Sequence, residues 1–135
     1  MDVPEALRFA AENHRAVLAT RRRDGSPQMS PVACGVQDGR IVVSSRETAV
    51  KVKNLRRDAR TSVCVMNDGF YGAWVQIDGN AEIVSLPDAM DGLVAYFRQL
   101  SGEHPDWDDY RAAMQREERV LIRVTPERAG PNVSG

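Results

Sequence analysis

The sequence predicts a mainly β domain with helices (α+β class), built as a six-stranded antiparallel barrel. The first observation is the dipeptide Asp-Gly, which suits tight hairpin turns and occurs at 24–25, 38–39, 68–69 and 78–79. The second is a set of β-type runs beside these turns, at residues 16–20, 28–36, 40–44, 61–66, 73–83 and 119–124. The third is the presence of helical patterns between the strands, which is typical of a barrel with helical crossovers. Because the chain has 135 residues and no linker-like stretch, we expect one domain over 1–135.

The N-terminal half is expected to hold a helix, three strands and a second, short helix. Asp2 can cap the first helix, and Pro4 falls in its first turn, where the missing N–H costs nothing. The first two Asp-Gly turns join neighbouring strands as hairpins. The short helix begins at Glu47 or Thr48, and its buried face is formed by two apolar residues one turn apart, Val52 and Leu55.

The C-terminal half is expected to hold two strands, a helical hairpin and a last strand. The pair Asp78-Gly79 lies inside a long strand, where we interpret it as a bulge. Ser85 resembles the first residue of a capping box, so the first helix of the hairpin should follow it and run to Leu100, with Gly102 as its C-terminal stop. The second helix should start at Pro105, with an apolar stripe made of Trp107, Tyr110 and Met114.

The composition excludes several functional classes. Two cysteines are too few for a disulfide framework, no run of about 18 apolar residues is present, and the N-terminus lacks the apolar core of a signal peptide. We therefore expect a cytoplasmic protein in a reducing compartment. The sequence contains no phosphate-loop, dinucleotide-binding or metal-ligand motif, so no metal site is predicted.

Nucleophilic catalysis is also poorly supported by the sequence. Cys34 and Cys64 lie in apolar alternating runs, where burial raises the pKa of a thiol. The two histidines, His14 and His104, lie at predicted helix ends. The spacing permits a pair between Cys64 and a histidine, but a buried, inert cysteine is the more common case, and we predict no catalytic residue.

The net charge of −1 hides a difference between the two halves of the chain. Residues 1–67 hold 12 basic and 7 acidic residues, a balance of +5, whereas residues 68–135 hold 6 and 12, a balance of −6. Either the halves pair their charges in the fold, or the basic half binds a polyanion. Nucleic acid is the less favoured polyanion, because no aromatic residue that could stack on bases lies between Phe9 and Phe70.

One segment of the basic half carries a signal for phosphate binding. It follows the third strand and opens the short helix, where free backbone N–H groups and hydroxyls can form an anion site. Lys51 lies in the first turns of that helix, and Arg46 lies just before it. The hydroxyl groups are those of Ser44, Ser45 and Thr48. The alternative is an exposed basic helix on an ordinary surface.

Three motifs resemble a known family. Residues 17–30 resemble the opening hairpin of the pyridoxamine 5′-phosphate oxidase-like family, whose fold is the FMN-binding type of split β-barrel. The run Lys-x-x-Asn-Leu-Arg-Arg-Asp from Lys51 resembles the signature that follows the family's third strand. The runs Gly-Glu-His-Pro-Asp-Trp from Gly102 and Arg-Val-Leu from Arg119 resemble its actinobacterial branch, which uses the deazaflavin coenzyme F420.

The resemblance implies a homodimer of split barrels with two cofactor sites at the interface. The residues that correspond to the family's phosphate site are Ser44, Ser45, Arg46, Thr48, Lys51 and Asn54. The residues that correspond to the strand along the cofactor ring are Gln28, Ser30, Pro31 and Val32. Trp74 and Gln76 would approach the site from the fifth strand, of the same or of the partner subunit. One departure is Ala49, because the family often has an arginine shortly before the lysine.

The resemblance implies an oxidoreductase that transfers a hydride from reduced F420 to a small unsaturated or quinone-like acceptor. The cofactor would supply the redox chemistry that the side chains lack. The balance of +4 in residues 46–60 matches the phosphodiester and oligoglutamate tail of F420 better than the single phosphate of FMN. Two alternatives stay open: an FMN-binding split-barrel oxidoreductase, and a cofactor-binding module without turnover. We interpret Phe70, Tyr71 and Trp74 either as walls of the acceptor pocket or as packing at the dimer interface, and we expect no nucleic-acid or membrane partner.

Overall fold

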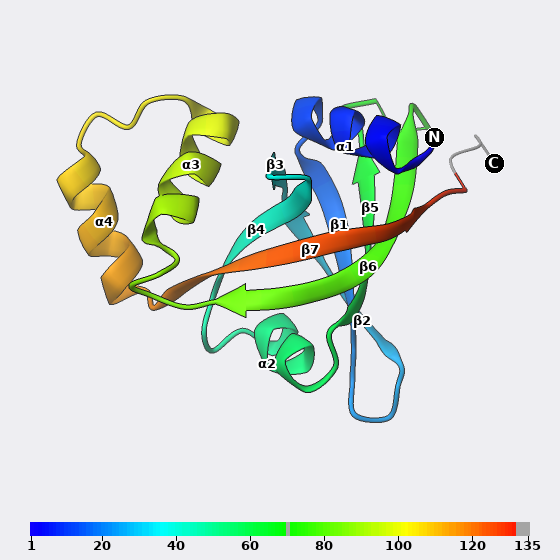
Figure 1. Ribbon diagram of the computed structural model, residues 1–135. Helices are drawn as coiled ribbons and strands as arrows, with labels where there is room; N and C mark the ends of the chain where they lie inside the picture. The colour runs from blue at the N-terminus through cyan, green and yellow to red at the C-terminus, as the bar shows by residue number, and fades with distance from the viewer. Residues whose placement is uncertain (70, 132–135) are drawn as a thin grey trace.

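The computed structural model describes residues 1–69 and 71–131, and its strands form one antiparallel sheet that curls into a barrel (Figure 1). The strands are β1 (Arg15–Arg21), β2 (Pro27–Ala33), β3 (Gly35–Gln37), β4 (Arg40–Arg46), β5 (Arg60–Met66), β6 (Trp74–Val84) and β7 (Arg119–Ala129). Their order in the sheet is β2-β1-β5-β6-β7-β4-β3, so β2 and β3 lie at its opposite ends. The prediction of a mainly β, antiparallel split barrel is confirmed.

The prediction of a single strand at 28–36 is wrong, because two strands, β2 and β3, occupy this segment. The barrel therefore has seven strands among the described residues instead of six. The break lies at Cys34, whose N–H donates to His14 O at 2.8 Å. Since β2 pairs with β1 and β3 pairs with β4, the chain must cross at Cys34 from one end of the sheet to the other.

The long strand β6 contains the predicted bulge. Its register against β7 shifts between Asp78 and Gly79. A Cβ on Gly79 would collide with the carbonyl oxygen of Thr125 and lie 2.9 Å from its carbonyl carbon. Only glycine fits at this close approach of two backbones.

The helices in the described residues are α1 (Val3–Glu12), α2 (Val50–Arg57), α3 (Met90–Ser101) and α4 (Trp107–Arg116). Asp2 caps α1 as predicted, since its Oδ1 accepts from Glu5 N–H at 2.9 Å. The prediction that Ser85 caps the next helix is wrong, because α3 begins at Met90 after Ala89, which makes no side-chain cap bond. The Ser85 hydroxyl instead accepts a hydrogen bond from Arg56 (3.1 Å), and residues 86–89 form a turn.

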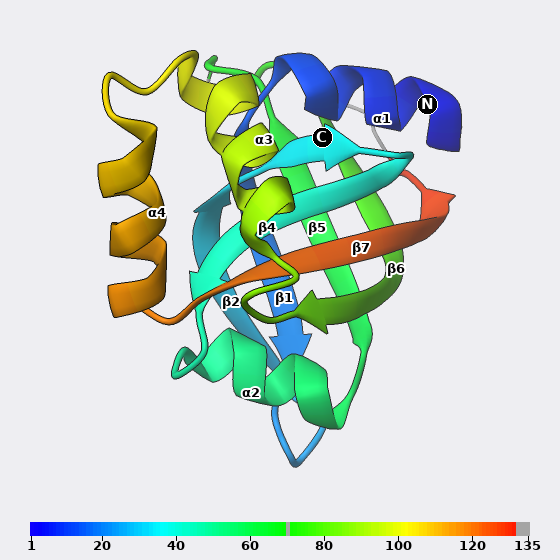
Figure 2. The same cartoon turned by 60° about the vertical axis from the view of Figure 1, so that its left-hand side comes forward.

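The helices divide the core into two parts. The barrel interior is filled mainly by Val, Ile and Leu side chains, with α1 packed on it at one end and α2 at the other (Figure 1). A second cluster lies between the α3–α4 hairpin and the outer side of β4 and β7 (Figure 2), and it contains Val42, Leu93, Tyr110, Met114 and Leu121. The predicted apolar stripe of α4 therefore faces this second cluster. Among the described residues, no helix is long and apolar enough to cross a membrane.

Candidate functional site

The two ends of the sheet meet along a line that we call the seam, between β2 and residues 43–46 of β4. β3 pairs only with residues 40–42 of β4, so the rest of that edge has no neighbouring strand in the described part of the chain. Contacts between β2 and β4 bring the two edges together. The chain leaves the seam at Arg46, turns, and enters α2, which covers the lower end of the barrel in Figure 1.

The first turn of α2 has the features of an anion site. Its N-cap residue, Ala49, makes no side-chain cap bond, and within residues 1–69 and 71–131 no acceptor is found for the N–H groups of Val50 and Lys51. Thr48 is exposed beside them, and Lys51 is half-buried. No carboxylate forms an ion pair with Lys51 in the described structure. Free N–H groups, a hydroxyl and an unpaired cation thus lie within four consecutive residues.

The end of β4 places its predicted residues on different sides. Ser45 is buried in the barrel opposite Val120, and Ser44 lies on the other face of the strand opposite Leu121. The two serines therefore cannot both face one ligand through their side chains.

Arg46 is engaged in an ion pair instead of standing free. Its Nη2 lies 3.2 Å from Glu117 Oε1, and Arg119, its cross-strand partner, binds the same oxygen at 2.8 Å. The hydrogen bond and charge of Arg119, with those of Arg46, lower the pKa of Glu117 below its usual value. Glu117 neutralises two arginines that would otherwise repel each other across the strands.

The predicted ring-binding residues of β2 alternate between two faces. Gln28, Ser30 and Val32 lie opposite the buried residues of β1 and are half-buried, whereas Pro31 is exposed on the outer face. The Ser30 hydroxyl oxygen is buried and has no hydrogen-bond partner among the described residues. An unpaired buried hydroxyl is costly unless a ligand or water satisfies it, which fits a polar ligand at the seam.

Asn54 and Thr20 form an internal connection that the sequence analysis did not identify. Asn54 is 6% exposed, and its Nδ2 donates to Thr20 Oγ1 at 3.1 Å. Its Oδ1 accepts from Arg57 at 3.0 Å, so both ends of the amide are used inside the protein. Alternation along β1 could have indicated Thr20, a polar residue on the same face as Ala16 and Leu18.

Trp74 and Gln76 are not brought to the seam of their own chain. Register aligns Gln76 with Cys64, Val17 and Pro31 across the outer face of β6, β5, β1 and β2. Trp74 is half-buried one row further along this face. Tyr71 is 90% exposed, and Phe70 lies outside the described residues.

A basic groove lies between α2 and the β1–β2 hairpin. It is lined by Arg22, Arg23, Asp24, Val50, Lys53, Asn54 and Arg57. Four cations face one carboxylate there, and hydrogen bonds from Ser26 lower the pKa of that carboxylate, Asp24. Other cations of the same segment are used in ion pairs, Arg56 with Glu47 and Arg60 with Asp58.

Ion pairs between the two halves of the chain do not neutralise their opposite net charges. Of the ion pairs among the described residues, two join the halves, Arg15 with Asp68 and Arg46 with Glu117. The others link residues within one half, such as Arg128 with Asp78. Positive charge therefore remains concentrated on the surface around α2.

Neither cysteine is arranged as a nucleophile. Burial raises the pKa of Cys34 to about 12 and also raises that of Cys64. His14 bonds the backbone oxygen of Cys34 at 2.8 Å, through Nδ1 and not toward the thiol. No group of His, Cys, Asp and Glu suited to a metal ion occurs in the described residues.

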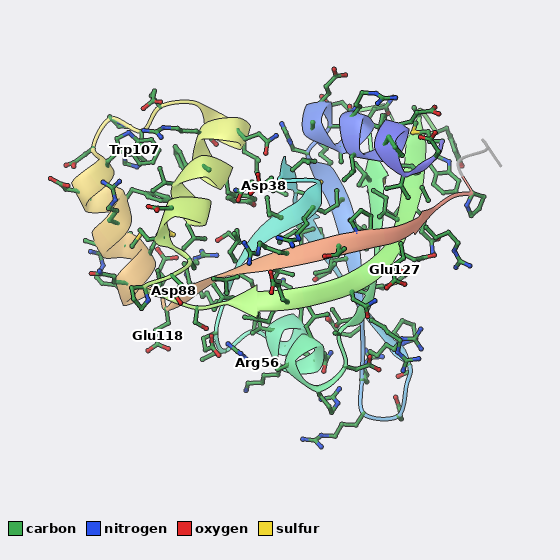
Figure 3. The ribbon with its side chains drawn as sticks, viewed as in Figure 1. Asp38, Arg56, Asp88, Trp107, Glu118 and Glu127 are labelled. Atoms are coloured by element: carbon green, nitrogen blue, oxygen red, sulfur yellow. The ribbon has the colours of Figure 1, made fainter. Side chains whose placement is uncertain are left out.

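The Gly102–Trp107 motif forms part of the helical hairpin and not of the seam. The His104 ring lies 5.1 Å from Phe97, 5.7 Å from Trp107 and 5.6 Å from Tyr110, between centroids. Arg98 stacks over Trp107, whose Nε1 donates to Glu103 at 3.0 Å. Figure 3 shows Trp107 at the end of the hairpin where α3 and α4 are connected. This aromatic cluster holds the two helices together.

Known proteins share both the sequence and the fold of this chain. The profile of the family described as pyridoxamine 5′-phosphate oxidase matches residues 3–131. A relative from Mycobacterium tuberculosis named F420H(2)-dependent biliverdin reductase is 27% identical over 124 residues, which cover 92% of this chain and 83% of the relative. The crystal structure of a conserved hypothetical protein from the same species has a TM-score of 0.77 at 28% identity, over 96% of this chain and 82% of that one. A structure named F420 reductase has the same fold, with a TM-score of 0.65 at 22% identity over 87% of this chain and 90% of that one.

Proposed function

We propose a function from one premise: this chain belongs to the pyridoxamine 5′-phosphate oxidase family. It is an oxidoreductase that transfers a hydride from reduced coenzyme F420 to a small unsaturated or quinone-like acceptor. The names of the relatives, F420H(2)-dependent biliverdin reductase and F420 reductase, support this cofactor. The observation that carries the proposal is the half-buried Lys51 at the uncapped start of α2, which forms no ion pair with any described residue.

The start of α2 fits the phosphate of such a cofactor. A phosphate oxygen can accept from the free N–H groups of Val50 and Lys51, and the lysine ammonium supplies the opposite charge. Thr48 offers a hydroxyl at the same turn. Ser45 and Asn54 flank this turn in the sequence and are both buried, and Arg46 contributes only if the anion competes with Glu117.

The basic groove favours F420 over FMN. FMN has one phosphate, whereas F420 continues into an oligoglutamate tail. Arg22, Arg23, Lys53 and Arg57 surround an exposed Val50 beside the phosphate turn, so a chain of carboxylates that leaves this turn meets positive charge. The phosphate turn alone would serve either cofactor.

The side chains bind and orient, and the cofactor, when bound, supplies the hydride. Gln28, Ser30 and Val32 line the inner side of β2, where Ser30 offers a hydroxyl without a protein partner. Neither thiol is ionised at neutral pH, because both pKa values are raised. We therefore assign no general acid or base to this chain.

The outer face of β2, β1, β5 and β6 is the surface that we propose for a homodimer. It carries Met29, which is 64% exposed, next to the exposed Pro31 and Ala33. Trp74 and Gln76 lie on this face and away from their own seam. In such a dimer they would reach the partner's site instead of their own.

Visible absorbance of the purified chain, titrated with F420 and with FMN, tests the proposal. We expect F420 to bind, and reduced F420 to be oxidised by at least one compound in a panel of enones, quinones and tetrapyrroles. Tight binding of FMN without binding of F420 would establish the FMN alternative. Binding of F420 without turnover of any acceptor would establish a cofactor-binding module.

The length of the glutamate tail provides a second test. Long-tailed F420 should bind more tightly than a short-tailed form, and added salt should remove the difference. Arg23→Ala should reduce the advantage of the long tail, whereas Arg8→Ala, an exposed arginine on α1 at the other end of the barrel, should not. An equal response of the two variants would contradict the role of the groove.

A further inference from the structure

A chain of hydrogen bonds connects α2 with β2 through Thr20, which is 1% exposed. Arg57 Nη2 donates to Asn54 Oδ1 at 3.0 Å, and the same nitrogen donates to Arg21 O at 2.7 Å. Asn54 Nδ2 donates to Thr20 Oγ1 at 3.1 Å. Thr20 Oγ1 then lies 3.2 Å from Gln28 Oε1. The chain thus runs from a cation of the basic groove to a side chain of the seam.

The donor and acceptor character of these groups fixes the direction of each hydrogen bond between Arg57 and Gln28. A guanidinium can only donate, so Arg57 requires the carbonyl oxygen of Asn54 and turns the Asn54 nitrogen toward Thr20. That nitrogen also only donates, so the Thr20 hydroxyl accepts from it and directs its own proton to Gln28. The reverse orientation of Gln28 would aim two donors at one hydroxyl and leave a buried proton without an acceptor.

The orientation of the Gln28 carboxamide follows from this direction. Its Oε1 is used by Thr20, and its Nε2 donates to Met29 O at 3.1 Å, which uses one of the two hydrogens on that nitrogen. With Oε1 held toward Thr20, the end of the carboxamide that turns away from Thr20 is Nε2, which keeps one free hydrogen. A ligand that meets this end must offer an acceptor.

We propose that Thr20 is a positioning residue, which fixes Gln28 so that it donates to a ring carbonyl oxygen or ring nitrogen of the ligand along β2. Asn54 is a second positioning residue. Its Oδ1 is held by Arg57, so its Nδ2 must face Thr20. The inference rests on the proposed function only in placing a ring system at Gln28. Thr20 and Asn54 act through Gln28 and need not touch the ligand.

Binding measurements with a matched control test this role. Thr61 is another buried strand threonine (6% exposed), and its hydroxyl donates to Ala19 O at 2.7 Å, so it takes no part in the hydrogen bonds between Arg57 and Gln28. Thr20→Val should raise the Kd of the bound cofactor about tenfold, Thr20→Ser should restore it, and Thr61→Val should change it by less than about twofold. In a Gln28→Ala background, Thr20→Val should add nothing. Equal losses from Thr20→Val in both backgrounds, or from Thr61→Val, would overturn the proposal.

A second variant, Asn54→Asp, keeps the shape of the side chain but reverses the direction of the hydrogen bonds to Thr20 and Gln28. In Asn54→Asp, one carboxylate oxygen accepts from Arg57 and the other accepts the Thr20 proton, so Gln28 must turn Nε2 toward Thr20. Oε1 then faces the ligand in place of Nε2, and cofactor affinity should fall about tenfold even if Thr20→Val does not fold. Unchanged affinity in Asn54→Asp would also overturn the proposal.

NMR of the ligand-free, ¹⁵N-labelled full chain separates this inference from the proposed function. The side-chain amide signals of Gln28 should shift in Thr20→Val and in Asn54→Asp, and should stay in place in Thr61→Val. If the wild-type chain binds neither F420 nor FMN, the proposed function fails and these signals decide the orientation alone. Gln28 signals that do not move in either variant would refute the positioning role.

Discussion

Removing the charge of Lys51 is expected to have opposite effects on stability and on binding. Lys51 is the second residue of α2, where the helix dipole is positive, and no described carboxylate pairs with it. A cation at this end of a helix costs about 0.3–1 kcal/mol. Lys51→Met, which keeps the aliphatic stem, should therefore raise the Tm of the ligand-free chain by about 1–4 °C.

Binding should change in the other direction and by more. A hydrogen bond to a charged group contributes about 1.5–3 kcal/mol, so the loss of the ammonium should raise the Kd of the cofactor about 10- to 100-fold. Hydride transfer from cofactor that is already bound should slow much less, because the proposed contact of Lys51 is with the phosphate and not with the ring. Lys53→Met, on the exposed side of the same helix, should raise the Kd of a short-tailed cofactor by less than about threefold.

Thermal melts without cofactor and absorbance titrations with it measure the two effects on the same samples. A higher Tm together with weaker binding is the signature of a residue retained for function at a cost in stability. A Lys51→Met chain that melts lower and binds cofactor as tightly as the wild type would refute the reasoning on both counts.

Three further predictions concern the fold and its ionisable groups. Gly79→Ala should lower the free energy of unfolding by about 3 kcal/mol or more in urea titrations, because its methyl group collides with the Thr125 backbone, and a loss below about 1 kcal/mol would mean that the bulge relaxes. With a thiol reagent at pH 7, Cys64 should be labelled slowly and Cys34, with its pKa near 12, only on unfolding, so peptide mass spectra with early Cys34 label would contradict its burial. Arg119 and Arg46 lower the pKa of Glu117 from 4.5. The contribution of ionised Glu117 to folding stability is therefore complete above that pH and is lost as the pH falls through the folded-state pKa. The Tm difference between wild type and Glu117→Gln should therefore be largest at neutral pH and vanish in acid, and a difference independent of pH would exclude the ion pairs as its cause.

Local patterns in the sequence predicted most of the secondary structure. The Asp-Gly pairs, the cap at Asp2 and the apolar stripe of α4 depend on residues close together in the chain, so they can be recognised in the sequence. The failures have tertiary causes. The strand at 28–36 had to break at Cys34 because its two parts pair with opposite ends of the sheet. Ser85 caps no helix because residues 86–89 form a turn and α3 begins only at Met90, and its hydroxyl instead accepts from Arg56 on α2.

One part of the candidate site could be predicted from the sequence, and another part could not. Lys51 and Thr48 are close in the chain, so the phosphate signal at the start of α2 could be predicted from spacing. The separation of Ser44 from Ser45, and the use of Arg46 by Glu117, depend on which face of β4 meets the barrel interior. No pattern in the sequence places Glu117 opposite Arg46, because 71 residues separate them.

The sequence by itself determined the class of fold, the position of the turn that we propose for phosphate binding, and the surplus of positive charge around it. Each of these is a property of neighbouring residues: hairpin turns, a helix start and a local count of charges. Only the tertiary structure decided that Asn54 donates to Thr20, that Trp74 and Gln76 face away from their own seam, and that Ser30 has no partner among the described residues. The physical reason is that register and barrel closure decide which distant side chains share a face, and those are set by packing of the whole sheet.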